Sequence, residues 1–93
     1  MFSLAYHPLV VKDLQNFSKP LQRRIILTLD KKLITNPVEF GKPLRNELKG
    51  YYRLKIGDCR IVYRIINDTI TVFVLHIGQR KKSIVYEEAK KRK

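Results

Sequence analysis

Residues 51–77 read YYRLKIGDCRIVYRIINDTITVFVLHI, and this stretch decides the fold. It is rich in β-branched and aromatic residues, and the polar pairs Gly57-Asp58 and Asn67-Asp68 divide it into three runs. Gly in the first pair suits a type II′ turn and Asn-Asp suits a type I′ turn, and both turn types join antiparallel strands. The stretch therefore predicts a three-stranded antiparallel meander with strands at residues 51–56, 59–66 and 69–77.

Two-residue turns also set the register, and the register sets the face on which each side chain lies. Ile56 is expected opposite Cys59, and Lys55 opposite Arg60. One face, the expected core, collects mostly apolar residues: Leu54, Ile56, Cys59, Ile61, Tyr63, Ile65, Ile70, Val72, Val74 and His76. The other face mixes cations with apolar residues and Thr71: Arg53, Lys55, Arg60 and Arg64 among Val62, Thr71, Phe73 and Leu75.

The rest of the chain predicts one strand, two helices, a loop and a short last helix around this meander. Alternation predicts a strand over residues 2–6, and apolar residues at helical spacing predict a helix over residues 8–17. Ser18 is the expected N-cap of a longer helix that ends at Asn36-Pro37, so the two helices form a hairpin that covers the core face. Residues 37–50 lack periodicity and predict a loop with Leu44 or Leu48 as its buried anchor. Ser83 is expected to cap a helical segment from residue 84 into the tail, which completes a single α+β domain over residues 1–93.

Composition narrows the functional class. The 93 residues carry a formal charge of +12, which indicates an acidic partner. A hydrophobic content of 44% excludes a disordered basic tail. A single cysteine, Cys59, excludes an internal disulfide framework and fits a reducing compartment. The first residues lack a cationic region before an apolar run, and no stretch reaches the length of a membrane span, so a cytoplasmic protein is expected.

The cationic face has the side chains that phosphate recognition needs. Lys55 opposite Arg60 costs stability, since like charges on opposed strand positions repel, and Asp58 is the only acid between residues 51 and 64. The chain must turn after Gly78, which can bring Arg80 and Tyr86 to the edge of this face. Guanidinium groups bind phosphate oxygens bidentately, and a tyrosine ring can stack on an unpaired base. This face is therefore the candidate RNA-binding site.

The same residues suit cleavage of RNA without a metal. Clustered cations stabilise the extra charge of the transition state and can lower the pKa of a neighbouring lysine. A two-metal nuclease needs converging carboxylates, and the eight acids here are scattered, so no cofactor is expected. A pair of catalytic histidines is disfavoured because His76 falls on the core face as a hydrogen-bonded structural residue and His7 lies at a corner. Cys59 shares the core face and is expected to be buried.

The run from Leu48 to Ile65, followed by residues 72–77, Gly78-Gln79-Arg80 and Val85-Tyr86, resembles the RelE/ParE superfamily of toxins of type II toxin-antitoxin systems. The resemblance covers nearly the whole chain. It implies a RelE-like fold with one curved sheet. RelE-type members are ribosome-dependent endoribonucleases that cut messenger RNA in the ribosomal A site, whereas ParE-type members poison DNA gyrase and lack the basic set.

Matching the RelE pattern position by position implies five active-site residues. Arg53 and Lys55 would act around the 2′-hydroxyl, Arg60 on the phosphate, Arg80 on the leaving oxygen and Tyr86 on the base. Other residues are expected to bind substrate or ribosomal RNA: Tyr51, Arg64, Lys81, Lys82, Lys90, Lys91, Arg92 and Lys93.

One position departs from the family pattern. The first basic residue is commonly Lys, but here it is Arg53, whose guanidinium is a poor general base. Lys55 or Tyr86 could take the proton instead, or Arg53 could act only by stabilising charge. A neighbouring subfamily uses a Glu with a His before the terminal Tyr; Val85 occupies that His position, so that mechanism is not expected.

Two other functions stay open. One is a ParE-like gyrase poison and the other is a noncatalytic RNA-binding or ribosome-associated domain. The superfamily also implies a cognate acidic antitoxin, RelB-like or other, that folds on binding and covers the helix hairpin and residues 83–93. The expected partners are therefore an antitoxin, the ribosome and messenger RNA, with no membrane.

Overall fold

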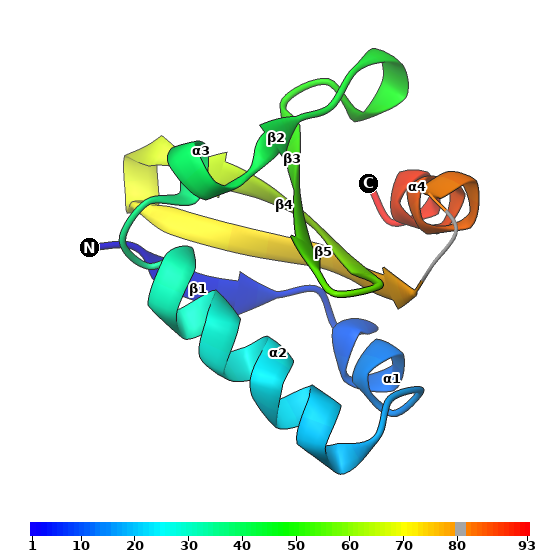
Figure 1. Ribbon diagram of the computed structural model, residues 1–93. Helices are drawn as coiled ribbons and strands as arrows, with labels where there is room; N and C mark the ends of the chain where they lie inside the picture. The colour runs from blue at the N-terminus through cyan, green and yellow to red at the C-terminus, as the bar shows by residue number, and fades with distance from the viewer. Residues whose placement is uncertain (80–81) are drawn as a thin grey trace.

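The computed structural model describes residues 1–79 and 82–93, without the side chains of residues 82 and 83. A five-stranded sheet has the order β1-β5-β4-β3-β2 (Figure 1). Its strands are β1 (Ser3–Tyr6), β2 (Lys42–Pro43), β3 (Tyr51–Ile56), β4 (Cys59–Ile66) and β5 (Thr71–Gln79). The helices are α1 (Val10–Leu14), α2 (Lys19–Lys32), α3 (Pro37–Phe40) and α4 (Lys82–Lys91), with short 3-10 turns η1 (Asn46–Leu48) and η2 (Asn67–Thr69). The predicted α+β class and the predicted meander are confirmed.

The register of the first hairpin is the predicted one. Ile56 pairs with Cys59, and Lys55 pairs with Arg60. Gly57 has a φ of 58°, in the left-handed region where glycine is favoured at a two-residue turn. The first strand, β1, pairs in parallel with β5 at the edge of the sheet. These pairings place Arg53, Lys55 and Arg60 on one face of the sheet.

The helices α1 and α2 cover the other face and form the main core with it (Figure 1). Ser18 caps α2 as predicted, because its Oγ accepts a hydrogen bond from the Leu21 amide at 3.4 Å. Ile25, Leu29 and Leu33 are fully buried against the sheet. The first helix is shorter than predicted, although Phe17 beyond its end is still buried in this core.

A second, smaller core lies on the face that carries the cations. Val85 and Ala89 of α4 pack on Val62 and Leu75, and Leu48 joins them from η1. The sequence predicted apolar residues on this face but not that a helix buries them. The cations therefore lie around a helix-covered patch rather than across an open sheet.

A β-bulge corrects the predicted face of His76. Val62 pairs with His76 and Tyr63 pairs with Val74, so Leu75 is an extra residue in β5. The bulge moves His76 to the second face and brings Ile77 into the main core. The prediction that His76 lies on the core face is wrong. It assumed that side chains alternate between the two faces without interruption from residue 70 onward, and the inserted residue interrupts this alternation.

Two loops also differ from prediction. The second meander connection is not a two-residue turn: η2 and Ile70, which has left-handed φ and ψ of 49° and 53°, join Ile66 to Thr71. Ile70 is 52% exposed and does not belong to the core, contrary to expectation. Residues 37–50, predicted as a loop, contain α3, η1 and the edge strand β2, with Leu48 as the buried anchor. Among the residues that the structure describes, no helix is long and apolar enough to cross a membrane.

Candidate functional site

A cleft of about 810 Å³ opens between the β2–η1 segment, β3 and α4. Arg53 lines it from β3, and Tyr86 lines it from α4. Further cations line the cleft as well, namely Lys42, Arg45 and Lys90, whereas Glu87 is its one carboxylate among the described lining residues. A cleft with this charge and a tyrosine ring can hold a phosphate beside an unpaired base.

The remaining cations of the predicted active site lie along the same face. Arg53 pairs with Val62 in the register, and Lys55 pairs with Arg60 two positions further along the hairpin. Lys55 is exposed, whereas Arg53 and Arg60 are half-buried. Arg80 and Lys81 lie outside the described residues, as does the side chain of Lys82. The structure thus brings Arg53 and Tyr86 together in the cleft, with Lys55 and Arg60 toward the hairpin turn.

Sequence reasoning missed Lys42 and Arg45 as lining residues of the cleft. They come from residues 37–50, a segment without periodicity that gave no reason to assign a face. The signal that could have found them is the edge strand β2, whose Lys42 pairs with Arg53 in the register. A two-residue strand is too short to show alternation, so only the pairing identifies it.

Helix α4 is held over the sheet by a buried ion pair between Arg92 and Asp13. Arg92 Nη1 donates to Asp13 Oδ2 at 2.5 Å and Nη2 donates to Oδ1 at 2.8 Å. The two side chains are 11% and 8% exposed. Because bidentate pairs fix both distance and orientation, this contact sets where α4, and with it Tyr86, lies.

The side chains of the ion pair also form hydrogen bonds with backbone groups of β5 beyond the end of β1. The last bond between β1 and β5 comes from the His7 amide to the Val74 carbonyl, at 2.8 Å. Further along, Asp13 Oδ2 accepts from the Ile77 amide and Arg92 Nη1 donates to the Leu75 carbonyl, both at 3.1 Å. The signal in the sequence was an acid, Asp13, inside the apolar stripe of a helix.

The C-terminal cations predicted to dock on RNA are engaged with neighbouring groups. Lys90 Nζ lies 2.9 Å from Glu87 Oε1 and 3.6 Å from Glu47 Oε1. A hydrogen bond with Glu87 raises the pKa of Lys90. Lys91 pairs with Glu88 at 3.6 Å, and Lys93 Nζ donates to the Glu47 carbonyl. The contacts of Lys90 and Lys93 with Glu47, together with the Arg92–Asp13 pair, fasten the tail to the domain, whereas the Lys91–Glu88 pair lies within α4.

Tyr51 and Arg64 lie opposite each other at the far end of the same face, next to Phe73 of β5. A depression of about 320 Å³ includes both of them together with His7, Arg92 and Lys93. Tyr51 also packs against the smaller core beneath α4. These two predicted substrate-binding residues are therefore separated from Lys55 and Arg60 by the length of the hairpin.

The two histidines occupy different surroundings. His7 Nδ1 accepts from the Leu9 amide at 3.1 Å, and its ring lies edge-on to Phe73. His76 is buried, and its Nδ1 has no hydrogen-bond partner among the described residues, contrary to the expected hydrogen-bonded histidine. The geometry does not join them as an acid–base pair.

Cys59 is buried, as expected, and burial raises the pKa of its thiol. A thiol held in its protonated form is a weak nucleophile. Its place is in the main core, among apolar side chains of the sheet and of α2.

The comparisons with known proteins agree with this architecture. The family model "ParE toxin of type II toxin-antitoxin system, parDE" matches residues 4–84. The protein named Toxin RelE from Mycobacterium tuberculosis is 32% identical over 82 residues, which are 88% of this chain and 84% of that protein. The mRNA interferase toxin RelE of Escherichia coli K12 is 36% identical over 67 residues, 67% of this chain and 70% of the relative.

A solved structure supports the same assignment. The toxin-antitoxin complex RelBE2 from Mycobacterium tuberculosis contains a chain that superposes with a TM-score of 0.75 at 25% identity, covering 85% of this chain and 98% of the other. The family match covers most of the strands and helices described above, including the hairpin that carries Arg53, Lys55 and Arg60. The chain therefore belongs to the RelE/ParE superfamily of toxins of type II toxin-antitoxin systems.

Proposed function

We propose that this toxin is a ribosome-dependent endoribonuclease that cuts messenger RNA in the ribosomal A site without a metal. The observation that carries the proposal is the cationic cleft that Arg53 and Tyr86 both line, with Lys55 and Arg60 on the same face of the sheet. Its relative from Escherichia coli is named an mRNA interferase, which supports the same chemistry. The proposed setting is the cytoplasm, where ribosomes and messages are present.

The proposed reaction is a transesterification within the RNA. The 2′-oxygen loses its proton and attacks the adjacent phosphorus, and the bond from phosphorus to the 5′-oxygen breaks as that oxygen gains a proton. Arg53 and Lys55 would act around the 2′-hydroxyl, and Arg60 would stabilise the charged phosphate. Arg80 would serve the leaving oxygen, and Tyr86 would stack on the base.

Arg53 is excluded as the general base of the proposed reaction. An arginine stays protonated in proteins, so Arg53 contributes charge rather than proton transfer. Lys55 and Tyr86 are the two candidates that can lose a proton. Lys55 pairs with Arg60 in the register, so its amine belongs to the same cationic face.

An acidic antitoxin is the proposed regulator. The solved complex of a related toxin with its antitoxin supports such a partner. The net charge of +12 favours an acidic chain, which would cover the helix hairpin and the C-terminal segment.

The test is cleavage by purified protein on programmed ribosomes, with 5′ ends mapped by primer extension. Cuts are expected within the A-site codon. Replacing Lys55 or Arg80 by Ala should lower the cleavage rate by roughly 10²- to 10³-fold, the usual cost of losing one transition-state cation. Lys12→Ala removes an exposed cation of α1 away from the site and should leave the rate unchanged. Intact messages under these conditions would overturn the proposal.

The second candidate is a gyrase poison, the activity expected of ParE-type members, because the matching family model is described as a ParE toxin. Inhibition of gyrase supercoiling that persists in Arg53→Ala and Lys55→Ala, with messages left intact, would establish it. A noncatalytic RNA-binding domain would instead bind RNA with a steeply salt-dependent affinity and leave messenger RNA uncut.

A further inference from the structure

A row of aromatic and basic side chains crosses the sheet beside the end of α4. Tyr51 of β3 pairs with Arg64 of β4, and Arg64 pairs with Phe73 of β5. His7, directly after β1, continues the row, because its ring lies edge-on to the ring of Phe73 with the two centroids 6.3 Å apart. Neighbouring strands lie about 4.8 Å apart, so a cation has an aromatic residue on each side.

The members of this row line one depression of about 320 Å³, which we call the Arg64 site. Ile66 and Leu75 add apolar lining, and Arg92 and Lys93 complete it from the tail. No described lining residue is acidic. The volume lies at the lower end of the range for small-molecule sites, so it suits a ligand of about one nucleotide rather than a folded partner.

Arg64 carries a charge that the described residues do not neutralise. Its side chain is exposed, and no salt bridge or cation–ring contact in that part of the chain includes it. Lys93 is exposed as well, and its ammonium donates to the Glu47 carbonyl, a neutral group that leaves the charge in place. Arg92 differs, because Asp13 pairs with it. Two cations of the site are therefore available to an anionic group of a ligand.

The rest of the lining suits a flat, polar ring. Tyr51 and Phe73 are half-buried, so each leaves part of its side chain open to the depression. Aromatic residues on a sheet face are a recurrent platform for nucleobases. His7 Nδ1 accepts from the Leu9 amide at 3.1 Å, so the neutral imidazole carries its proton on Nε2 and keeps a donor. Together with a guanidinium, these groups match the base and the phosphate of one nucleotide.

The Arg64 site is separate from the cleft that Arg53 and Tyr86 line. The two hollows share no lining residue in the described part of the chain. Lys93 lines the site, and its ammonium reaches the Glu47 carbonyl in η1, a segment that borders the cleft. The end of the chain thus lies between the two hollows, and a nucleotide in the Arg64 site is not the scissile one.

We propose that the Arg64 site binds one nucleotide, with its phosphate at Arg64 and Lys93 and its base on the ring of Phe73 beside His7. A free nucleoside monophosphate and a nucleotide within single-stranded RNA share this chemistry. An acidic polypeptide is disfavoured as the occupant, because its carboxylates would engage the cations and leave the rings unused. The inference does not rest on the proposed function, since neither the ribosome nor cleavage enters into it.

The test is a titration of the isotope-labelled full chain with adenosine 5′-monophosphate, followed by the NMR shifts of its backbone amides. Shifts are expected at His7, Arg64 and Phe73, with a dissociation constant of roughly 10 μM to 1 mM for a ligand of this size. Adenosine and inorganic phosphate each carry half of the ligand and should bind at least about tenfold more weakly. Shifts confined to Arg53 and Tyr86, or phosphate that binds as well as the monophosphate, would overturn the proposal.

Two variants examine the two halves of the site. Arg64→Gln removes the charge and should weaken binding of the monophosphate about 10- to 100-fold. Phe73→Leu removes the stacking surface and should weaken it about 5- to 100-fold. Dispersed amide signals would show that each variant is folded. Unchanged affinity in either variant would overturn the proposal.

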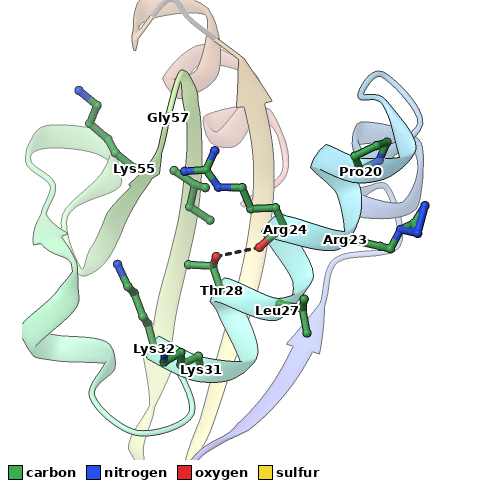
Figure 2. A pocket seen from close by; sticks show the side chains of 10 residues that line it. Pro20, Arg23, Arg24, Leu27, Thr28, Lys31, Lys32, Lys55 and Gly57 are labelled. Carbon is green, nitrogen blue, oxygen red and sulfur yellow. Dashed lines mark hydrogen bonds between the residues drawn. The ribbon is translucent and has the colours of Figure 1, made fainter.

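The matched control is Arg23→Gln, which also replaces one exposed arginine by glutamine. Arg23 lines a different hollow, of about 570 Å³, between α2 and the turn of the β3–β4 hairpin. Figure 2 shows its side chain extending from α2 away from that hollow. The control has the same net charge as Arg64→Gln, so a change of less than about twofold is expected if binding depends on position rather than on total charge. Equal losses in the two variants would refute the site.

A trinucleotide of adenosine without terminal phosphates distinguishes the two sources of the nucleotide. Binding at least about tenfold tighter than the monophosphate, with losses in Arg64→Gln and Phe73→Leu, would support the site and assign it to single-stranded RNA. Binding no tighter than adenosine would support a free nucleotide with a terminal phosphate. Poly-glutamate is the probe for an acidic polypeptide: if it displaces the monophosphate and binds Phe73→Leu as tightly as the wild type, the proposal is overturned.

Discussion

His76 is a buried titratable side chain of β5 that lies near α1 and the C-terminal segment. It is 6% exposed, and its Nε2 lies 4.0 Å from Asp13 Oδ1. Asp13 faces it from α1, while Arg92 and Glu88 belong to the C-terminal segment. Burial is the largest influence and lowers the pKa of His76 below its ordinary value of 6.5. The folded protein therefore resists protonation at this position.

Stability should consequently fall in mild acid. At a pH just below 6.5 the unfolded chain binds a proton at His76 while the folded chain does not, so protonation favours unfolding. With respect to His76, the free energy of unfolding should be constant well above pH 6.5, where the side chain is neutral in both states, and should decrease as the pH falls below 6.5. Urea unfolding between about pH 5 and 8 measures this. His76→Gln should flatten the acid side of the curve, whereas His7→Gln should retain the fall; an unchanged curve in His76→Gln would contradict the assignment.

Substitutions at Tyr86 distinguish a role in stacking on the base from a role in proton transfer. If its ring stacks on the base, Tyr86→Phe should retain most of the cleavage rate while Tyr86→Ala loses about 10- to 100-fold, since stacking on an aromatic is worth about 1–3 kcal/mol per base. Single-turnover cleavage on programmed ribosomes measures both. A Phe variant as slow as the Ala variant would instead make the Tyr86 hydroxyl the proton acceptor and leave Lys55 with a charge role only.

At the scale of elements, the Asp13–Arg92 pair decides whether α4 is docked. Arg92→Ala leaves a buried carboxylate without its cation, which should cost about 3–5 kcal/mol of unfolding free energy. Thermal unfolding measures the loss, and hydrogen exchange should show α4 opening before the sheet. Lys91→Ala removes the exposed pair with Glu88 and should cost less than about 1 kcal/mol. Equal protection of α4 in both variants would refute the anchoring role.

The hydroxyl of Tyr63 forms a hydrogen bond that links α3 to the sheet. Tyr63 is fully buried, and its hydroxyl donates to the Pro37 carbonyl at 2.6 Å. Tyr63→Phe leaves that carbonyl unsatisfied and should cost about 1–3 kcal/mol in chemical unfolding. Tyr52, whose ring stacks on Tyr63 at 5.7 Å, is the control. Tyr52→Phe keeps the stacked rings and should be close to neutral; the reverse ranking would contradict this account.

For the whole molecule, the charge of +12 opposes folding through self-repulsion. Salt screens this repulsion, so the melting temperature should rise by roughly 4–8 °C if screening restores about 1 kcal/mol in a domain of this size. Calorimetry at low and moderate sodium chloride measures the rise. Arg24→Gln/Lys32→Gln should melt higher than the wild type at low salt and respond less to salt. A lower melting temperature in that variant would mean that these cations stabilise the fold.

Much of the sheet could be predicted from the sequence because its determinants are local. Alternation and a glycine turn place Lys55 opposite Arg60, and the structure has this pairing. The second connection could not be predicted in the same way, since η2 and Ile70 replace the two-residue turn. The bulge at Leu75 moves His76 to the other face of the sheet. The bulge could not be predicted, because an inserted residue depends on how β4 and β5 pack in three dimensions.

The same distinction between local and long-range determinants applies to the candidate site. The sequence by itself determined the fold class, the cations on one face of the hairpin and the superfamily, because periodicity and motif spacing act over a few residues. Only the tertiary structure decided that α4 covers that face, that Asp13 holds Arg92 across 79 positions of sequence, and that β2 closes the cleft beside Arg53. Contacts between distant segments depend on packing and charge in three dimensions, and no local pattern encodes them.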